Sequence, residues 1–229
     1  AALAKELGVE ILLNSNVTEI VAHKKQATSL LVNNKKQDFD IIIGSADYHH
    51  VEQKLLKPEF RNYTAEYWEK RTMAPSSLIF YLGINKRLEK LDHHNLFCDE
   101  DLRQHALEIY DSPQWPSKPL FYASCSSKSD RTTAPEGCEN LYILMPVAPG
   151  IEDNEEIREK YFNIIIGRIE KFTGQKIIED IIYKRSYAHR DFIKDYHSFK
   201  GNAYGLANTL MQTAFMKPKI KSGKVTNLY

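Results

Sequence analysis

The stretch that most constrains the fold is residues 38–47, in which three consecutive isoleucines follow an acidic lead-in. A short apolar run of this kind is typical of a strand buried on both faces of a sheet. The run closes on small residues at 44–46, which let the backbone approach another group closely. Ligands bind at such strand ends in open α/β sheets, so we expect this end to lie beside a bound molecule.

Composition places the chain among ordinary globular proteins and excludes several functional classes. Of its 229 residues, 42% are hydrophobic and 27% are charged, which is not the composition of a disordered protein. The net charge of +1 gives no electrostatic indication of a nucleic-acid partner. No apolar run approaches the ~20 residues that a membrane-spanning helix needs. Peripheral membrane contact stays open, because a few exposed apolar side chains can provide it.

The cysteines indicate the compartment. The chain contains Cys98, Cys125 and Cys138, an odd number, and no pair has C-x-x-C spacing. This pattern argues against both a zinc site and a disulfide framework, so we expect a reducing cytoplasm. The first residues show no charged segment followed by an apolar one, as a signal peptide would.

Neither end of the chain carries the usual boundary signals. Residues 1–7 favour a helix but follow no capping residue, and the β-prone residues 225–229 precede no turn. We therefore expect this chain to be part of a longer protein.

The first 48 residues are expected to supply part of one domain. Alternating apolar and polar residues predict a small β-meander, a common appendage of dinucleotide-binding folds. The expected elements are a helix at 1–7, a strand at 9–13, meander strands at 17–23 and 27–32, and the buried strand at 38–47.

The clearest helix covers residues 154–172, where apolar residues repeat every three or four positions. Asp153 or Asn154 can cap its start, and Gly174 ends it. The other expected helices are 49–56, 64–72, 100–110, 188–196 and 206–216, and the expected strands are 76–85, 95–98, 120–125, 140–147 and 177–187.

Most motifs of known chemistry are absent. There is no G-x-G-x-x-G, P-loop, H-E-x-x-H or G-x-S-x-G sequence. The adjacent pairs at 49–50 and 93–94 are better explained as surface or capping histidines than as metal ligands, because neighbouring side chains point apart. His189 and Asp191 would suit a base and its orienting group, but no nucleophile accompanies them, and a helix-start pair is the simpler explanation. We assign no catalytic residue and no metal site.

The most informative loop is residues 198–206, where Gly201 and Gly205 flank Tyr204. Two glycines around an aromatic residue allow close passage to a flat ligand or another backbone, although an ordinary helix-entry loop has the same composition. The run 199–206, continuing to Lys217-Pro218, resembles the late signature of bacterial phytoene desaturases, which are FAD-dependent enzymes of carotenoid biosynthesis. Weaker matches lie at 44–47, 76–83 and 141–146.

The resemblance implies a fold and a cofactor. It implies an α+β or α/β chain that combines part of a Rossmann-like FAD-binding domain (1–48, with a return strand at 219–229) and a mixed-sheet substrate domain covered by helices (49–218). The family's G-x-G-x-x-G would precede residue 1, and its C-terminal flavin motif would follow Tyr229. Lys200 and Lys217 stand where the family usually has arginine, a change that weakens bidentate contacts.

The resemblance also implies the site. FAD would take a hydride from a long acyclic isoprenoid, and apolar area would bind that substrate. Val17, through its backbone, and Ala46 would lie near the cofactor, whereas Gly201, Tyr204 and Gly205 would border the reaction cavity. The strands and the helix at 154–172 would build either a tunnel wall or an ordinary core. The alternatives are a retinol-saturase-like or amine-oxidase-like flavoprotein and a non-catalytic module that binds a lipid or a partner. The oligomeric state is not indicated.

Overall fold

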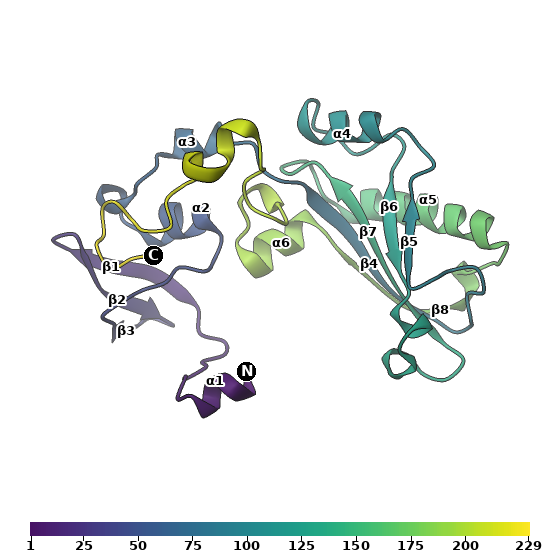
Figure 1. Cartoon of the computed structure of the whole chain (residues 1–229), viewed down its shortest axis with the longest axis horizontal. Coiled ribbons are helices and arrows are strands. Elements are labelled where there is room, and N and C mark those ends of the chain that lie inside the picture. Colours follow the sequence, from purple (N-terminus) through teal and green to yellow (C-terminus); the bar gives the residue numbers. More distant parts are fainter. The chain divides into compact units, whose positions relative to one another are not determined.

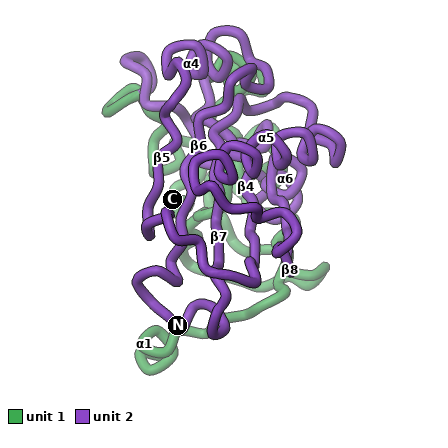
Figure 2. Tube along the Cα trace, turned by 90° about the vertical axis from the view of Figure 1, so that its right-hand side faces the viewer, with its two compact units in different colours: residues 1–71, 213–229 green, residues 72–212 purple.

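The computed structural model describes residues 1–229, which divide into two compact units. Unit 1 comprises residues 1–71 and 213–229, and unit 2 comprises residues 72–212 (Figure 2). The expected boundaries lie after residues 48 and 218, and the compact units divide after residues 71 and 212. The functional assignment of the two parts stays a prediction.

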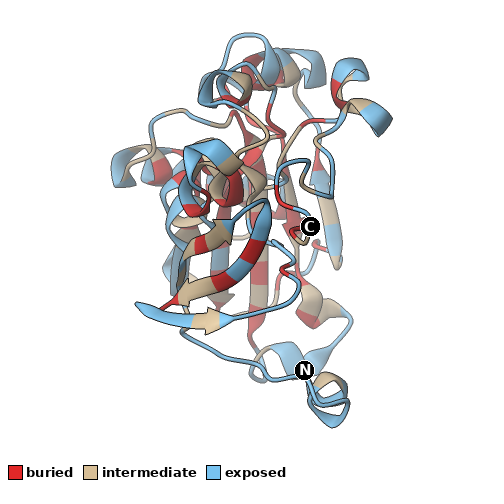
Figure 3. Cartoon of the chain, turned by 90° about the vertical axis from the view of Figure 1, so that its left-hand side faces the viewer, coloured by how far each residue is buried: buried red, intermediate tan, exposed pale blue.

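Unit 1 contains the meander that the sequence indicated. Its strands β1 (Val17–His23), β2 (Gln26–Val32) and β3 (Lys35–Asp38) form an antiparallel sheet in the order β1-β2-β3. A preceding helix, α1 (Ala2–Glu6), has no buried residue (Figure 3). The core of unit 1 consists of Ile20, Ala27, Ile42, Val51, Leu55, Leu56, Val225 and Leu228.

Two short helical segments of unit 1 begin at residues whose side chains cap them. The Asp47 carboxylate accepts a hydrogen bond from the His50 backbone at the start of α2 (Tyr48–His50), which continues as a π-helix over Val51–Leu55. Thr64 caps α3 (Ala65–Glu69) in the same way, through the backbone N–H of Tyr67. Local side-chain chemistry thus sets both helix starts.

The central expectation for unit 1, a strand over 38–47 buried on both faces, was wrong. Ile42 is buried and forms one parallel bridge to Leu228, but Ile41 and Ile43 are 63% and 75% exposed. The helical segment before residue 56 and residues 225–228 cover only one side of this segment, so alternate side chains face solvent. Residues 9–13 likewise form no strand.

The small residues at 44–46 do permit a close approach, but to the chain's own backbone. The Gly44 N–H donates to the Tyr229 carbonyl at 2.7 Å. A Cβ atom on Gly44 would lie 3.3 Å from both Val51 methyl groups. The end of the 41–43 segment is therefore packed against residues 51 and 229.

Unit 2 is built on a five-stranded sheet in the order β5-β6-β7-β4-β8 (Figure 1). We expected a mixed sheet, but every strand pairing in it is antiparallel. Parallel neighbours need long crossover connections, whereas β6 and β7 follow each other as an antiparallel pair. The strands are β4 (Ser76–Ile84), β5 (His94–Phe97), β6 (Phe121–Ser124), β7 (Glu139–Val147) and β8 (Ile181–Tyr187).

One face of this sheet packs against the long helix α5 (Glu155–Thr173), as its apolar repeat predicted. Asn154 caps the start of α5, and Gly174 ends it in the left-handed conformation. Phe80 contacts Phe162 edge to face, with ring centroids 5.3 Å apart. The core of unit 2 therefore lies between α5 and alternate residues of β4 and β7: Leu78, Phe80, Leu82, Ile84, Leu141, Ile143, Met145 and Val147.

Two shorter helices complete unit 2, and one expected helix is missing. Helix α4 (Leu102–Tyr110) begins at its cap Asp101, and α6 (His189–Tyr196) follows β8. The expected helix at 206–216 is replaced by two 3₁₀ turns, Leu210–Gln212 and Ala214–Met216, and Leu210 and Phe215 are 81% and 91% exposed. A short helix depends on packing of its apolar face, which this segment does not have. No helix of the chain is long and apolar enough to cross a membrane.

Candidate functional site

The face of the five-stranded sheet opposite α5, which we call the open face, carries a row of aromatic and aliphatic side chains. Cross-strand register places Tyr81 of β4 opposite Tyr142 of β7. It also places Tyr122 of β6 opposite both Leu144 of β7 and Leu96 of β5. Because residues opposite one another share a face, these side chains form one continuous apolar surface across four strands.

The tyrosines of the open face contact one another. The ring centroids of Tyr81 and Tyr142 are 5.5 Å apart, and those of Tyr122 and Tyr142 are 6.4 Å apart. Burial, together with the nearby phenols of Tyr81, Tyr204 and Tyr122, raises the pKa of Tyr142 to about 12. The surface therefore offers aromatic area and hydroxyl groups, and Arg185 of β8, which lies opposite Tyr81 in the sheet, adds a cation at its border.

The loop that the sequence analysis singled out reaches this face. Tyr204 is 69% exposed, and its phenol is close enough to contribute to the raised pKa of Tyr142. The loop is anchored beside β4, because the Ser76 hydroxyl donates to the Gly201 carbonyl at 2.5 Å and the Ala203 N–H donates to the Pro75 carbonyl at 3.2 Å. The structure thus brings Tyr204 to the open face.

The two glycines of this loop have different surroundings. Gly201 is buried, with φ +62°, and packs directly against His189. Gly205 is half-buried, with φ +77°, and has open space where a Cβ atom would be. Both positions use the left-handed conformation that glycine adopts most easily. Gly201 therefore shapes the loop through a backbone contact with α6.

Two cavities lie at opposite ends of the open face. One, of about 440 Å³, is bordered by Tyr81, Asn140, Tyr142, Tyr183 and the loop at 133–135. The other, of about 240 Å³, lies beneath α4 next to Tyr122 and Leu144. Together with the tyrosine row between them, they give the open face the size and the apolar character of a small-molecule site.

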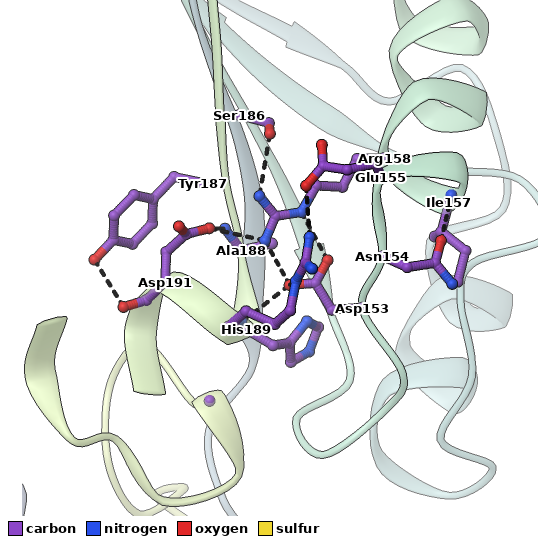
Figure 4. A network of polar contacts seen from close by, with 12 residues as sticks. Asp153, Asn154, Glu155, Ile157, Arg158, Ser186, Tyr187, Ala188, His189 and Asp191 are labelled. Carbon is purple, nitrogen blue, oxygen red and sulfur yellow. Dashed lines mark hydrogen bonds and ion pairs between the residues drawn. The ribbon is translucent and has the colours of Figure 1, made fainter. Parts of the chain in front are cut away.

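A buried polar network holds the start of α6, the helix that precedes the loop at 198–206 (Figure 4). The Arg158 guanidinium on α5 donates to both carboxylate oxygens of Asp153, at 2.7 and 2.6 Å, and to Asp191 at 2.8 Å. Asp191 also accepts from the Ala188 N–H at the start of α6. The network therefore ties the beginning of α6, and the loop that follows it, to α5.

The histidine and aspartate that suggested a base and its orienting group belong to this support. Asp191 bonds Arg158 and the start of α6, as described above, while His189 Nε2 bonds the Ala148 carbonyl at 2.7 Å. Burial lowers the pKa of His189. Sequence reasoning missed Arg158, since a single arginine on an otherwise regular helix gives no distinguishing signal. It also missed the tyrosine row, which the alternation of Tyr81, Tyr122 and Tyr142 within their strands could have indicated.

The histidine pairs have other partners. His93 Nδ1 is hydrogen-bonded to Ser129, and His94 Nδ1 to the Tyr122 hydroxyl. His49 packs edge to face against Trp68. The chain contains no group of three or more histidine, cysteine or acidic residues arranged to hold a metal ion.

A second buried carboxylate, Glu139, closes one end of the sheet. It pairs with Lys128 at 3.0 Å and Arg87 at 3.3 Å, and accepts a hydrogen bond from Ser127. Burial alone would raise the pKa of Glu139, but hydrogen bonds from Ser127, Lys128 and Cys125 outweigh burial and lower the pKa to about 2. The Glu139 side chain is therefore a fixed anion of the fold.

Glu139 should make stability depend on pH. Because its folded pKa lies below the ordinary 4.5, its contribution is fully present above pH 4.5 and is lost as the pH falls toward 2. The shift corresponds to about 3 kcal/mol of unfolding free energy. Urea denaturation of the wild type and Glu139→Gln should give a difference that shrinks across this window. A difference that stays constant from neutral pH to the acid limit would contradict the assignment.

Comparison with known proteins identifies the family. The model of the flavin containing amine oxidoreductases matches residues 1–229. This chain belongs to that family. This match confirms the resemblance to FAD-dependent desaturases at the level of the flavin family. The structure confirms the α+β fold class.

The chain also matches curated members of the flavin amine oxidoreductase family. It is 37% identical over 227 residues to a carotenoid 3,4-desaturase of Haloarcula japonica, covering 99% of this chain and 46% of that protein. It is 29% identical to a 4,4'-diapolycopen-4-al dehydrogenase of Metabacillus indicus (97% and 44% covered) and 30% identical to a 4,4'-diapophytoene desaturase of Staphylococcus haemolyticus (99% and 47%). The chain thus spans about half the length of these relatives.

A solved structure supports the fold alone. An oxidoreductase from Methanosarcina mazei superposes with a TM-score of 0.51 at 13% identity, covering 82% of this chain and 40% of that protein. At this low sequence identity, the similarity shows only that the two backbones follow a similar path.

Unit 1 contains the two residues, Val17 and Ala46, that are expected to lie near the flavin cofactor of this family. Val17 begins β1, which is an outer strand of the meander, so one edge of its backbone has no strand partner. Ala46 is exposed in the turn that precedes α2. Both positions fit contacts at the border of a dinucleotide. Glu52, which is buried in the same unit, is already bonded by Asn62 and the Tyr63 N–H.

Proposed function

We propose that this chain supplies the substrate-binding part of an FAD-dependent enzyme that desaturates a long acyclic isoprenoid. The observation that carries the proposal is the aromatic open face, on which Tyr81, Tyr122, Tyr142 and Leu144 form a continuous surface between two cavities. The names of the relatives, carotenoid and diapophytoene desaturases, support the same substrate class.

The open face would bind such a molecule through apolar area. A hydrocarbon has no polar handle, and its burial stabilises the complex by about 25 cal/mol per Å². Tyr142 and Tyr122 would pack their rings along the chain, and Tyr204 would cover it from the loop side. We assign no acid or base, because the row presents phenols and no carboxylate.

FAD, when bound, supplies the hydride acceptor. The protein's own part is to orient the substrate and exclude water from it. The Val17 backbone and Ala46 would border the cofactor, whereas Gly201 and Gly205 would set the path of the loop that carries Tyr204. Peripheral membrane contact belongs to the proposal, since a long isoprenoid dissolves in lipid.

The proposal predicts a spectroscopic reaction. The full-length protein, with all segments that accompany residues 1–229, should be purified in mild detergent and supplied with FAD. Adding phytoene without oxygen should bleach the visible flavin absorption as the substrate is oxidised. Failure to bind flavin would reject the proposal in favour of a lipid- or partner-binding module.

A pair of substitutions tests the open face within the same assay. Tyr142→Ala should lower kcat/KM for phytoene about tenfold, because it removes a ring that contacts the substrate. Tyr142→Phe is the matched control and should stay near the wild-type value, since it loses only the hydroxyl. Equal losses in the two variants would point to hydroxyl chemistry instead of apolar contact.

A further inference from the structure

The cavity beneath α4 differs in chemistry from the rest of the open face. Its lining is almost entirely apolar and includes Leu102, Ala106 and Ile109 of α4 together with Leu120, Leu144 and Pro146. The larger cavity at the other end of the face instead includes Ser124, Ser126, Thr133 and Asn140. The two ends of the open face therefore suit different chemical groups.

The one buried histidine in this lining adds no polar group to the cavity. His105 Nδ1 accepts a hydrogen bond from the Leu120 N–H at 3.0 Å, and Nε2 bonds the Pro146 carbonyl at 2.9 Å. Nδ1 therefore carries no proton and Nε2 donates, so both nitrogens are occupied by the backbone. Only the carbon edge and the face of the ring remain for a ligand.

The cavity is continuous with the proposed substrate surface. Tyr122 and Leu144, which lie opposite each other on β6 and β7, line it directly. The next pair along the same face is Ser124 opposite Tyr142, and both of these residues line the larger cavity. An extended molecule lying along the tyrosine row would therefore enter the α4 cavity with one end.

We propose that the α4 cavity is a subsite for an unsubstituted, apolar end of the isoprenoid. This inference rests on the proposed function. An oxygen-bearing end would lose its hydrogen bonds to water there and find no partner, which disfavours it. Such an end is placed at the larger cavity, where hydroxyl and amide groups are available.

Substitution of Ala106 tests the subsite. Ala106 is half-buried on α4 and faces the cavity, so Ala106→Phe should fill the space. In the full-length protein with FAD, kcat/KM for phytoene should fall about tenfold or more, as for other changes in an apolar pocket. The fall in kcat/KM should be smaller for the shorter 4,4'-diapophytoene, because a shorter molecule reaches less far into the cavity. Leu107→Phe is the matched control: Leu107 is on the same helix, is 40% exposed and does not line the cavity.

Alkylation of Cys98 gives a second readout that does not depend on turnover. Cys98 lines the cavity and is exposed, whereas Cys125 and Cys138 are buried. Phytoene should slow alkylation of the Cys98 peptide, measured by mass spectrometry, in the wild type and in Leu107→Phe. The protection should be lost in Ala106→Phe.

The outcomes distinguish failure of the proposed subsite from failure of the proposed function. Suppose that phytoene bleaches the wild-type flavin but does not protect Cys98, and that kcat/KM for phytoene is the same in Ala106→Phe and Leu107→Phe. The subsite is then rejected and the proposed function stands. Equal protection of Cys98 by detergent alone would also reject it. If no isoprenoid bleaches the flavin, the proposed function itself fails. The wild-type protection measurement remains decisive even if Ala106→Phe does not fold.

Discussion

Replacing Gly201 with alanine should destabilise the protein by about 3 kcal/mol, because two unfavourable effects combine. The residue has φ +62°, a conformation that alanine adopts only with strain. Its new Cβ atom would lie 2.8 Å from His189 Cβ and 2.9 Å from His189 Cα. These atoms belong to the start of α6 and cannot rotate away. Urea denaturation of the wild type and Gly201→Ala would measure the loss.

Gly205→Ala is the matched control in the same loop. Gly205 also has positive φ, +77°, but no atom lies within 4 Å of the position that its Cβ would take. Only the backbone strain applies, so we expect a loss of about 1 kcal/mol. Equal losses in the two variants would show that the His189 contact does not limit position 201. Substrate affinity should also fall more in Gly201→Ala, since the loop presents Tyr204 to the open face.

Replacing Arg158 with methionine should destabilise the protein by about 3–5 kcal/mol, because it leaves a buried carboxylate without its partner. The Asp153 side chain is only 1% exposed and accepts two hydrogen bonds from Arg158. Burial alone would raise the pKa of Asp153, but Arg158 and the Arg190 N–H lower it. Methionine keeps much of the length of the side chain, so the loss reports the charge. Chemical denaturation at neutral pH is the direct measurement.

Arg190→Ala provides the comparison for this network. The Arg190 side chain is 52% exposed and pairs with Glu155 at 2.5 Å and with Asp153 at 3.7 Å. An exposed ion pair contributes little, so the loss should stay below about 1 kcal/mol. Arg158→Met should also weaken the pH dependence. The lowered pKa of Asp153 contributes stability above its ordinary range, and that stability disappears as the pH falls through the folded value. A loss in Arg158→Met no larger than in Arg190→Ala would contradict this account.

The parts of the fold that the sequence predicted well depend on local signals. Helix α5 has an apolar repeat, a capping Asn154 and a terminating Gly174 within one continuous segment. The starts of α2 and α3 follow from Asp47 and Thr64, whose side chains bond the backbone within one turn. In each case the residues that decide the structure are neighbours in the chain.

The errors arose where a distant partner decides the outcome. The isoleucines at 41–43 suit a strand covered on both sides, but residues 225–228 and the helical segment at 51–55 cover only Ile42. The segment 206–216 has helical spacing, yet the Gln212 side chain bonds the Thr72 backbone, and Leu210 and Phe215 stay exposed. Apolar pattern shows that a segment can be buried, and tertiary contacts decide whether it is.

The features of the candidate site also divide into those set by local sequence and those set by tertiary contacts. The sequence by itself determined the family, the loop at 201–205 and the alternation that places one set of side chains on each face of β4 and β7. Only the tertiary structure decided which face α5 covers, and hence that Tyr81, Tyr122 and Tyr142 form the row on the open face. Only the fold brings Arg158, Asp153 and Asp191 together behind the loop. The physical reason is that burial and charge pairing depend on residues far apart in the chain, whereas turns and periodicity are properties of adjacent ones.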